Sequence, residues 1–366
     1  MADRTHPTAA LRHWMTAGLL LVLACPALAH GGHEPAQTSA WTMWQWSPEI
    51  LVGLAVAGLI YWRGSRHGLV DRRWRILAFN GGLLALFVAL VSPVERLADH
   101  VFAIHQIEHM LLRTVAPMLI FLSRPQAALV RGLPGGVSKL FAGAGWLRRV
   151  AQILRFPPVA TVLFLLASYF WMLPRWHDLA ILNEPVHYLW HISLLVSGLL
   201  FFSVIFDRRA APHGPGLAAR LAMFVFAALG NIVLGAFLTF KTVALYSAYS
   251  TLGHMWHVSM LTDEQTGGII MWIPGTMMFA ITALVIIHRW SSEETRLVER
   301  RARTGRELMA AQRPANRLLA FGLLAFALLM LAIAFSVVAL IDHPPGMGHD
   351  FGKAGQIPGQ TEASGE

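Results

Sequence analysis

Apolar residues in this chain are gathered into long continuous runs, and short polar segments separate one run from the next. Most of these runs are near the ~20 residues that an α-helix needs to cross a bilayer, although the first and the fourth are shorter. The runs cover residues 48–62, 76–92, 99–122, 158–173, 185–206, 218–240, 265–287 and 318–341. The pattern predicts an all-α protein, a polytopic transmembrane helical bundle of about eight spans.

A shorter apolar stretch near the N-terminus has the features of a secretory signal. Arg4 and Arg12 precede it, and it ends in a small-x-small triplet whose last residue is Ala29. We expect a cleaved signal peptide over residues 1–29. The alternatives are an uncleaved first span and lipid attachment at Cys25, which the following proline disfavours. Cys25 is the only cysteine, so the mature protein would have neither a disulfide nor a thiolate metal ligand.

The remaining chain divides into three predicted parts. Residues 30–47 form a histidine-rich periplasmic leader, residues 48–341 form the bundle, and residues 342–366 form a polar tail that we expect to be disordered. The longest connection between spans, residues 123–157, is basic and amphipathic, and it is interrupted at Pro134-Gly135-Gly136. This segment is typical of a helix that lies in the membrane interface, not of a separate domain.

Composition also favours a lipid bilayer as the surroundings of the chain. Apolar residues make up 55% of the sequence, charged residues make up 13%, and the mean hydropathy is +0.53. The net charge of +9 would suit a nucleic-acid partner, but Lys and Arg are spread over several short segments instead of one patch. We therefore expect no nucleic-acid partner.

The distribution of Lys and Arg predicts the orientation of the spans. Four connecting segments hold most of the 29 basic residues: residues 63–75, 123–157, 207–220 and 288–317. These segments are expected to face the cytoplasm, because positively charged loops remain on that side of a membrane. The prediction is a multi-pass protein of a bacterial inner membrane, with both termini of the mature chain in the periplasm.

Histidines are distributed in the opposite direction. Outside the signal segment, only His67, His213 and His288 fall on the predicted cytoplasmic side, and the others fall on the periplasmic half. An unperturbed imidazole has a pKa of about 6.5, so most of these side chains are neutral and free to bind a metal. The outer half is therefore the predicted location of the chemistry.

Three closely spaced pairs carry this argument: His105 and His109, His187 and His191, and His254 and His257. A spacing of four residues places both imidazoles of the first two pairs on one face of a helix. The second pair follows Asn183 and Pro185, which are typical of a helix start, and the third precedes a predicted capping box at residues 262–265. All three pairs are expected at a similar depth near the outer interface.

A single pair could equally cap a helix or reach to the interface, but three pairs at one membrane level favour a metal or haem site. Met110, Met255 and Met260 lie beside these histidines. A His/Met donor set without cysteine suits copper in an oxidising compartment, so copper is the predicted cofactor, with haem and zinc as alternatives. Each methionine alone fits ordinary helix packing as well.

The two ends of the chain extend the predicted site. Cleavage after Ala29 would expose His30, whose amine and imidazole could chelate copper together. The tail adds His343, Met347 and His349 as further donors. The alternative is that the leader is a flexible polar segment, that the tail is disordered, and that neither binds a metal.

Three charged residues accompany the histidines. Arg113 continues the helix face of the first pair into the bilayer, so it needs a haem propionate, a carboxylate or a backbone carbonyl as partner, unless it reaches back to the interface. Glu108 and Asp263 lie next to histidine pairs and could orient the imidazoles by hydrogen bonds. Asp263 could instead cap a helix.

Three stretches together resemble a known family. They are HQIEHMLLRTVAPMLIFLSRP, HYLWHISLLVSGLLFFSVI and LTDEQTGGIIMW, in a region from about residue 45 to residue 290. The sequence resembles the CtaG group of assembly proteins for caa-type cytochrome c oxidase. By this resemblance, the positions expected to matter are His105, His109, His187, His191, Asp263, Gln265, Met271 and Trp272.

The resemblance also implies a role. It implies an integral membrane factor that a functional oxidase requires, not an enzyme, with copper delivery as its usual proposed task. The implied partners are subunits of a haem-copper oxidase and a periplasmic copper chaperone.

Other classes of protein remain open. HQIEH matches the H-x-x-E-H pattern of zinc proteases, and three histidine boxes are loosely similar to membrane di-iron enzymes, although those carry cytoplasmic boxes. Histidines on separate spans could also ligate a b-type haem, with Arg113 at a propionate. A copper transporter is disfavoured, because the donor residues gather on one side of the membrane only.

Overall fold

The computed structural model describes residues 44–66, 73–134, 145–207, 209, 214–255 and 258–303, which fall within one compact unit, Met1–Leu308. All regular elements in these residues are helices, which confirms the predicted all-α class for this part of the chain. The predicted signal peptide, most of the leader, the span at residues 318–341 and the tail lie outside the described residues.

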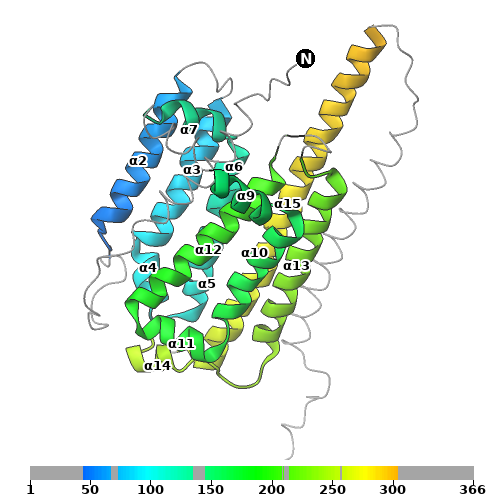
Figure 1. Ribbon diagram of the computed structural model, residues 1–366. Coiled ribbons are helices and arrows are strands. Elements are labelled where there is room, and N and C mark those ends of the chain that lie inside the picture. The colour runs from blue at the N-terminus through cyan, green and yellow to red at the C-terminus, as the bar shows by residue number, and fades with distance from the viewer. Residues whose placement is uncertain are drawn as a thin grey trace, which may run out of the picture. The chain divides into compact units, whose positions relative to one another are not determined.

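The helices follow one another in chain order (Figure 1). The first group is α2 (Pro48–Ser65), α3 (Arg73–Leu90), α4 (Pro93–Ala98), α5 (Phe102–Met110), η2 (Leu111–Val115), α6 (Ala116–Leu122) and α7 (Gln126–Gly132). The second group is α9 (Gly145–Leu154), α10 (Pro157–Trp171), α11 (Pro174–Leu182), α12 (Glu184–Ile205), α13 (Leu217–Phe240), α14 (Ala248–Leu252) and α15 (Met260–Arg303). Because η2 is a π-helical turn between α5 and α6, these three elements form one helix with a local widening.

Four helices in the described part of the chain are long and apolar enough to cross a membrane: α3, α12, α13 and the Met260–His288 portion of α15. α10 and α11 make a fifth if the 75° bend between them lies within one span. α2 has 18 residues but carries Glu49 and Arg63 near its ends. The helix formed by α5, η2 and α6 is not among the four, because none of these three elements is long enough by itself. The protein therefore has four or five candidate spans in these residues, and the eight predicted spans are not confirmed.

The helix α12 packs against α10, η2 and α6. α13 runs alongside α15, and α5 also packs on α15 (Figure 1). Gly198 of α12 lies so close to η2 that a Cβ at this position would overlap the carbonyl oxygen of Arg113. The helix that carries the second histidine pair can therefore approach η2 only because residue 198 has no side chain.

Helix starts agree only in part with the sequence prediction. Asn183 caps α12 through its side chain, as predicted. α15 begins earlier than predicted, at Met260, and the hydroxyl of Ser259 accepts a hydrogen bond of 3.1 Å from the backbone N–H of Thr262. The predicted capping box at residues 262–265 is therefore wrong, because those residues already lie inside the helix.

Two acidic residues of α15 instead hold other segments in place. The carboxylate of Asp263 accepts hydrogen bonds from the backbone N–H groups of Phe102, at 2.7 Å, and Ala103, at 3.0 Å. It thereby caps the N-terminus of α5 from a neighbouring helix. Glu264 pairs with Lys241 and accepts hydrogen bonds from backbone N–H groups in the loop after α13.

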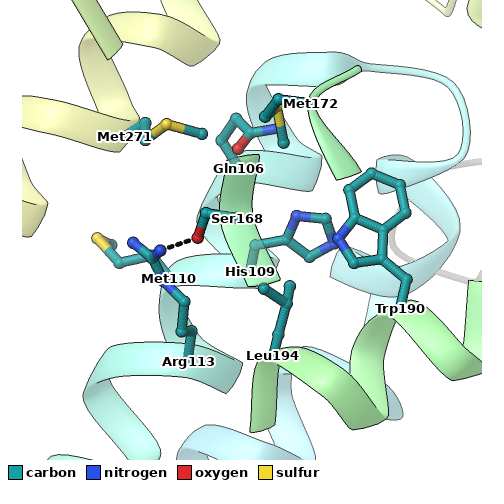
Figure 2. A pocket seen from close by; sticks show the side chains of 9 residues that line it. All are labelled: Gln106, His109, Met110, Arg113, Ser168, Met172, Trp190, Leu194 and Met271. Atoms are coloured by element: carbon teal, nitrogen blue, oxygen red, sulfur yellow. Dashed lines mark hydrogen bonds between the residues drawn. The ribbon is translucent and has the colours of Figure 1, made fainter. Parts of the chain in front are cut away.

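Arg113 joins four elements of the bundle through neutral partners, and Figure 2 shows its hydrogen bond to Ser168. Its guanidinium donates to the hydroxyl of Ser168 on α10 and, at 2.8 Å, to Oδ1 of Asn231 on α13. It also lies 4.5 Å from the ring centroid of Phe164. Nδ2 of Asn231 donates to the carbonyl of Met271 on α15 at 2.7 Å. The partners of this buried cation are therefore a hydroxyl, an amide and an aromatic face, not the propionate, carboxylate or carbonyl that we expected.

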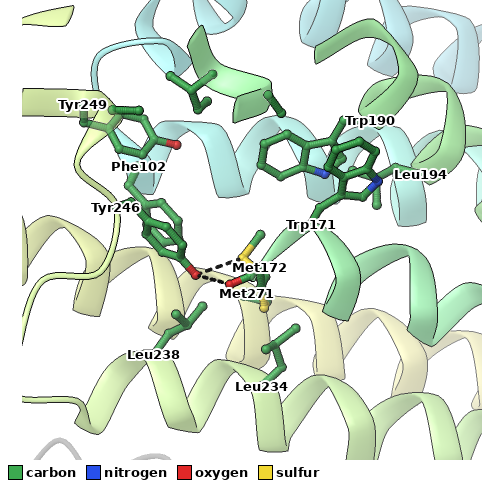
Figure 3. Packing of buried hydrophobic residues seen from close by; sticks show 13 residues of the cluster. Phe102, Trp171, Met172, Trp190, Leu194, Leu234, Leu238, Tyr246, Tyr249 and Met271 are labelled. Carbon is green, nitrogen blue, oxygen red and sulfur yellow. Dashed lines mark hydrogen bonds between the residues drawn. The ribbon is translucent and has the colours of Figure 1, made fainter. Parts of the chain in front are cut away.

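A cluster of buried aromatic residues lies at the end of the bundle where α5 begins (Figure 3). Phe102 stacks on Tyr246 with ring centroids 5.0 Å apart, and Trp171 stacks on Trp190 at 5.4 Å. The hydroxyl of Tyr246 donates to the carbonyl of Met172 at 2.9 Å. These contacts link α5, α10, α12 and the loop before α14, so the histidine-bearing helices share a packed surrounding.

Replacing Gly198 by alanine should destabilise the bundle. The added Cβ overlaps the backbone of η2, and overpacking of this kind costs about 1–3 kcal/mol. We expect a lower apparent melting temperature in detergent, followed by tryptophan fluorescence. Gly81→Ala is the matched control, because a Cβ there meets only Leu119 at 3.6 Å, an ordinary contact. Equal melting temperatures for the two variants would contradict the close packing of α12 on η2.

Replacing Asn231 by leucine should also lower stability, by about 1–3 kcal/mol, because the guanidinium of Arg113 and the carbonyl of Met271 lose a partner while they stay buried. Thermal unfolding in detergent measures this loss. A second variant that combines Asn231→Leu with Arg113→Met removes the buried cation as well and should recover part of the stability. A double variant that is less stable than the single variant would contradict this coupling.

Candidate metal centre

Two helices bring four histidines together. His105 and His109 come from α5, and His187 and His191 come from the beginning of α12. One ring nitrogen of each histidine lies within 4.8 Å of those of the other three, and Nε2 of His105 lies 3.4 Å from Nε2 of His187. Two of the three predicted pairs therefore form one group, which we call the four-histidine cluster.

The four-histidine cluster is almost closed to solvent. His105 is fully buried, His109 and His191 are 6% and 5% exposed, and the side chain of His187 is 12% exposed. Nε2 of His109 and Nε2 of His191 make no hydrogen bond with any described residue. Because a buried polar atom without a partner is costly, a metal ion bound to these nitrogens would satisfy both. The donor set fits a transition metal that accepts imidazole ligands, such as copper or zinc.

Hydrogen bonds around His105 select the ring tautomer that a metal needs. The carbonyl of Trp171 lies 3.1 Å from Nδ1 of His177, and a carbonyl can only accept, so this nitrogen carries the proton. Nε2 of a neutral His177 then accepts from the hydroxyl of Tyr249, at 3.0 Å. The hydroxyl oxygen of Tyr249 in turn accepts from Nδ1 of His105, at 2.7 Å. The lone pair of His105 is therefore on Nε2, the atom that faces His187.

Sequence reasoning did not assign a role to His177 or Tyr249. His177 was counted only among the outer histidines, and Tyr249 lies in the separate helix α14. The one signal in the sequence is an unpaired histidine four residues after the predicted span at residues 158–173, which is too common to be diagnostic.

Two carboxyl groups adjoin the cluster at His191. Oε1 of Glu108 lies 3.1 Å from Nε2 of His191, and Glu95 of α4 completes a group whose ligand atoms all lie within 4.8 Å of one another. Glu108 was expected near the first histidine pair, and the structure places it against His191 of the second pair. Glu95 was not predicted, because α4 is a short connection whose position depends on the tertiary fold.

A small pocket borders the cluster at His109 (Figure 2). Three methionine side chains line it, together with Arg113: Met110, Met172 and Met271. Met110 was predicted from its position beside His109, Met271 from the family resemblance, and Met172 was not predicted. Three thioether side chains therefore line a pocket that His109 of the cluster also lines.

The third predicted histidine pair does not join the cluster in the described residues. Nε2 of His254 lies 3.2 Å from Oδ2 of Asp263, and His257 lies outside the described residues, as does His30. Met260 packs against the aromatic cluster, and Met255 is half-buried. None of the described residues of this segment belongs to a metal-binding group.

Other positions expected from the family resemblance connect α15 to α13. Nε2 of Gln265 donates to the carbonyl of Lys241 at 2.9 Å, and the indole N–H of Trp272 donates to Oγ1 of Thr239 at 3.3 Å. Asp263 caps α5, as described above. These side chains hold the helices that position the cluster, and they do not face its centre.

Comparisons with known proteins agree with the resemblance. A family model described as cytochrome c oxidase caa3 assembly factor (Caa3_CtaG) matches residues 55–293. Uncharacterized proteins of Mycobacterium tuberculosis and Mycobacterium bovis are each 26% identical over 290 residues, which cover 74% of this chain and 43% of the relative. One of Mycobacterium leprae is 23% identical over 274 residues, or 72% of this chain and 42% of the relative. The chain thus spans less than half the length of these relatives, and no solved structure matches it.

The region matched by the family model contains all four histidines of the cluster, both adjoining glutamates and Arg113. It also covers more than half of the chain. The chain therefore belongs to the family of caa3-type cytochrome c oxidase assembly factors.

Proposed function

We propose that this protein is a membrane-bound assembly factor that holds copper at the four-histidine cluster and helps to deliver it to a haem-copper oxidase. The observation that carries the proposal is the convergence of four buried imidazoles from two helices, with ring nitrogens within 4.8 Å of one another. Family membership supplies the role in oxidase assembly, and the cluster supplies a chemistry that fits that role.

Copper fits the donors better than harder metals do. Imidazole suits both copper oxidation states, and the thioethers of Met110 and Met271 in the adjoining pocket are soft donors. The chain has a single cysteine, in the predicted signal peptide, so thiolate ligands play no part in the proposed site. Zinc uses the same imidazoles and is the alternative metal.

The proposed delivery is a ligand exchange at the edge of the cluster. His187 is the most exposed of the four imidazoles, so a donor side chain of a partner can reach the metal there first. The proposed partners are an oxidase subunit and a periplasmic copper chaperone. This requires the cluster to face the periplasm of a bacterial inner membrane, the orientation that the Lys and Arg distribution predicts.

A haem is less compatible with the cluster than a metal ion is. The ring of Trp190 lies 4.8 Å from that of His105 and 4.4 Å from that of His109, measured between centroids. The indole ring of Trp190 therefore packs directly on both imidazoles. A haem would need that space, because its flat macrocycle lies between its axial ligands.

Copper binding should depend on the four-histidine cluster. Purified full-length protein in detergent, loaded with Cu(I) under reducing conditions, should retain about one copper per chain by metal analysis. A variant with alanine at positions 105, 109, 187 and 191 should retain almost none. His288→Ala is the matched control, since His288 lies at the far end of the candidate span in α15.

The same samples test the alternatives. Equal copper retention by the wild type and the quadruple variant would overturn the proposal. A stoichiometric Soret band would show a haem protein instead, and selective retention of zinc over copper would show a zinc site. His254→Ala, measured in parallel, tests whether the third histidine pair contributes.

Replacing Tyr249 by phenylalanine should weaken copper binding by about 10–100-fold, although all four histidines remain. The change removes the hydroxyl that fixes the tautomer of His105. A chelator competition titration measures the copper affinity. Tyr246→Phe is the matched control, because its hydroxyl contacts the carbonyl of Met172 and not the cluster. Equal copper affinities of the two variants would contradict the role of Tyr249.

A further inference from the structure

We propose that Glu95, Glu108 and His191 form a second metal site, which binds a divalent cation of harder character than copper. Its three residues come from α4, α5 and α12, and one ligand atom of each lies within 4.8 Å of the other two. The site shares His191 with the four-histidine cluster. It goes beyond the proposed function, and only its competition with copper rests on that function.

The three side chains are buried and point their polar atoms at one another. Glu108 is fully buried, and His191 and Glu95 are 5% and 7% exposed. Beyond contacts among the three side chains themselves, both oxygens of Glu108, Oε2 of Glu95 and Nε2 of His191 make no hydrogen bond with the described residues. The 3.1 Å between Nε2 of His191 and Oε1 of Glu108 is the separation of two ligands that meet at one ion.

Two other buried carboxylates, those of Asp263 and Glu264, are satisfied by the protein. Asp263 accepts hydrogen bonds from two backbone N–H groups of α5. Glu264 accepts them from the loop after α13 and also pairs with Lys241. Glu95 and Glu108 therefore differ from their acidic neighbours, because their oxygens hold no backbone segment.

Electrostatics gives the class of ion. Two carboxylates close together in a dry site repel each other unless a proton or a cation lies between them. A divalent cation neutralises both charges at once. Two carboxylate oxygens and one imidazole are a typical partial ligand set for Mn²⁺, Fe²⁺ or Zn²⁺, whereas the neutral imidazole cluster suits copper.

Sharing His191 makes the two sites interdependent. Nε2 of His191 has one lone pair and can coordinate one ion at a time. A cation at the carboxylates and a copper ion in the cluster would therefore compete for this nitrogen, besides repelling each other. Occupancy of one site is expected to lower the affinity of the other.

Mn²⁺ alone is the probe for this site, because its bound and free forms differ in the electron paramagnetic resonance spectrum. Titration of the copper-free, full-length protein in detergent should show one bound Mn²⁺ per chain. Glu95→Gln and Glu108→Gln, which keep the shape of the side chain, should each weaken Mn²⁺ binding by about tenfold or more. Glu184→Gln is the matched control, because Glu184 lies at the start of α12 but outside the group.

Two histidine variants separate this inference from the proposed copper function. His191→Ala should weaken both Mn²⁺ and Cu(I) binding, and the ¹⁴N coupling to bound Mn²⁺ should disappear. The variant with alanine at both positions 105 and 109 should lose Cu(I) but keep Mn²⁺. Pre-loading the wild type with Cu(I) should lower its Mn²⁺ affinity.

The outcomes decide the two proposals independently. If the wild type binds no Mn²⁺, or if both glutamine variants bind Mn²⁺ as tightly as the wild type does, the second site is overturned and the copper proposal is unaffected. Mn²⁺ binding that depends on the glutamates in a protein that retains no copper supports the second site and overturns the copper function. Size-exclusion profiles of the glutamine variants show whether each one is folded.

Discussion

The carboxylate of Asp263 holds the first turn of α5, and the position of the four-histidine cluster depends on this contact. The N–H groups at the start of a helix have no acceptor within it, and Asp263 accepts those of Phe102 and Ala103. Such charge-assisted hydrogen bonds are strong in surroundings that exclude water. His105 and His109 follow within the next two turns of α5. Asp263, which is 161 positions from Phe102 in the sequence, therefore sets the placement of the first histidine pair.

Packing contacts position the second histidine pair, in addition to the contacts of His187 with Asp99 and of His191 with Glu108. α12 approaches η2 through Gly198, and its indole Trp190 packs on the rings of His105 and His109. The hydrogen-bond chain through Tyr249 then leaves the free lone pair of His105 directed at His187. The contacts that assemble the bundle are therefore the same contacts that orient the four histidines.

Sequence reasoning predicted the features that depend on local spacing. The helical class, the start of α12 at Asn183 and the two histidine pairs with a spacing of four all follow from short-range patterns. It failed where a partner is distant in the chain, because no periodicity reports such contacts. Asp263 was placed in a capping box of its own helix but caps α5, and the partners of Arg113 lie on α10 and α13. Glu95 was missed for the same reason. The number of spans depends on features that hydropathy does not show, such as the bend between α10 and α11.

Under the proposed function, the glutamates beside the cluster would affect how tightly a copper ion is held there. Four neutral imidazoles leave the charge of the metal uncompensated, and in surroundings of low dielectric constant this charge is costly to bury. Loss of a proton from Glu108, which lies in contact with His191, would lower that cost when copper binds, without any change in the copper ligands. A second cation at Glu95 and Glu108 would withdraw this stabilisation and also compete for His191. Under the proposed function, Glu95 and Glu108 would therefore favour retention of copper when they bind no second cation, and release of copper when they bind one.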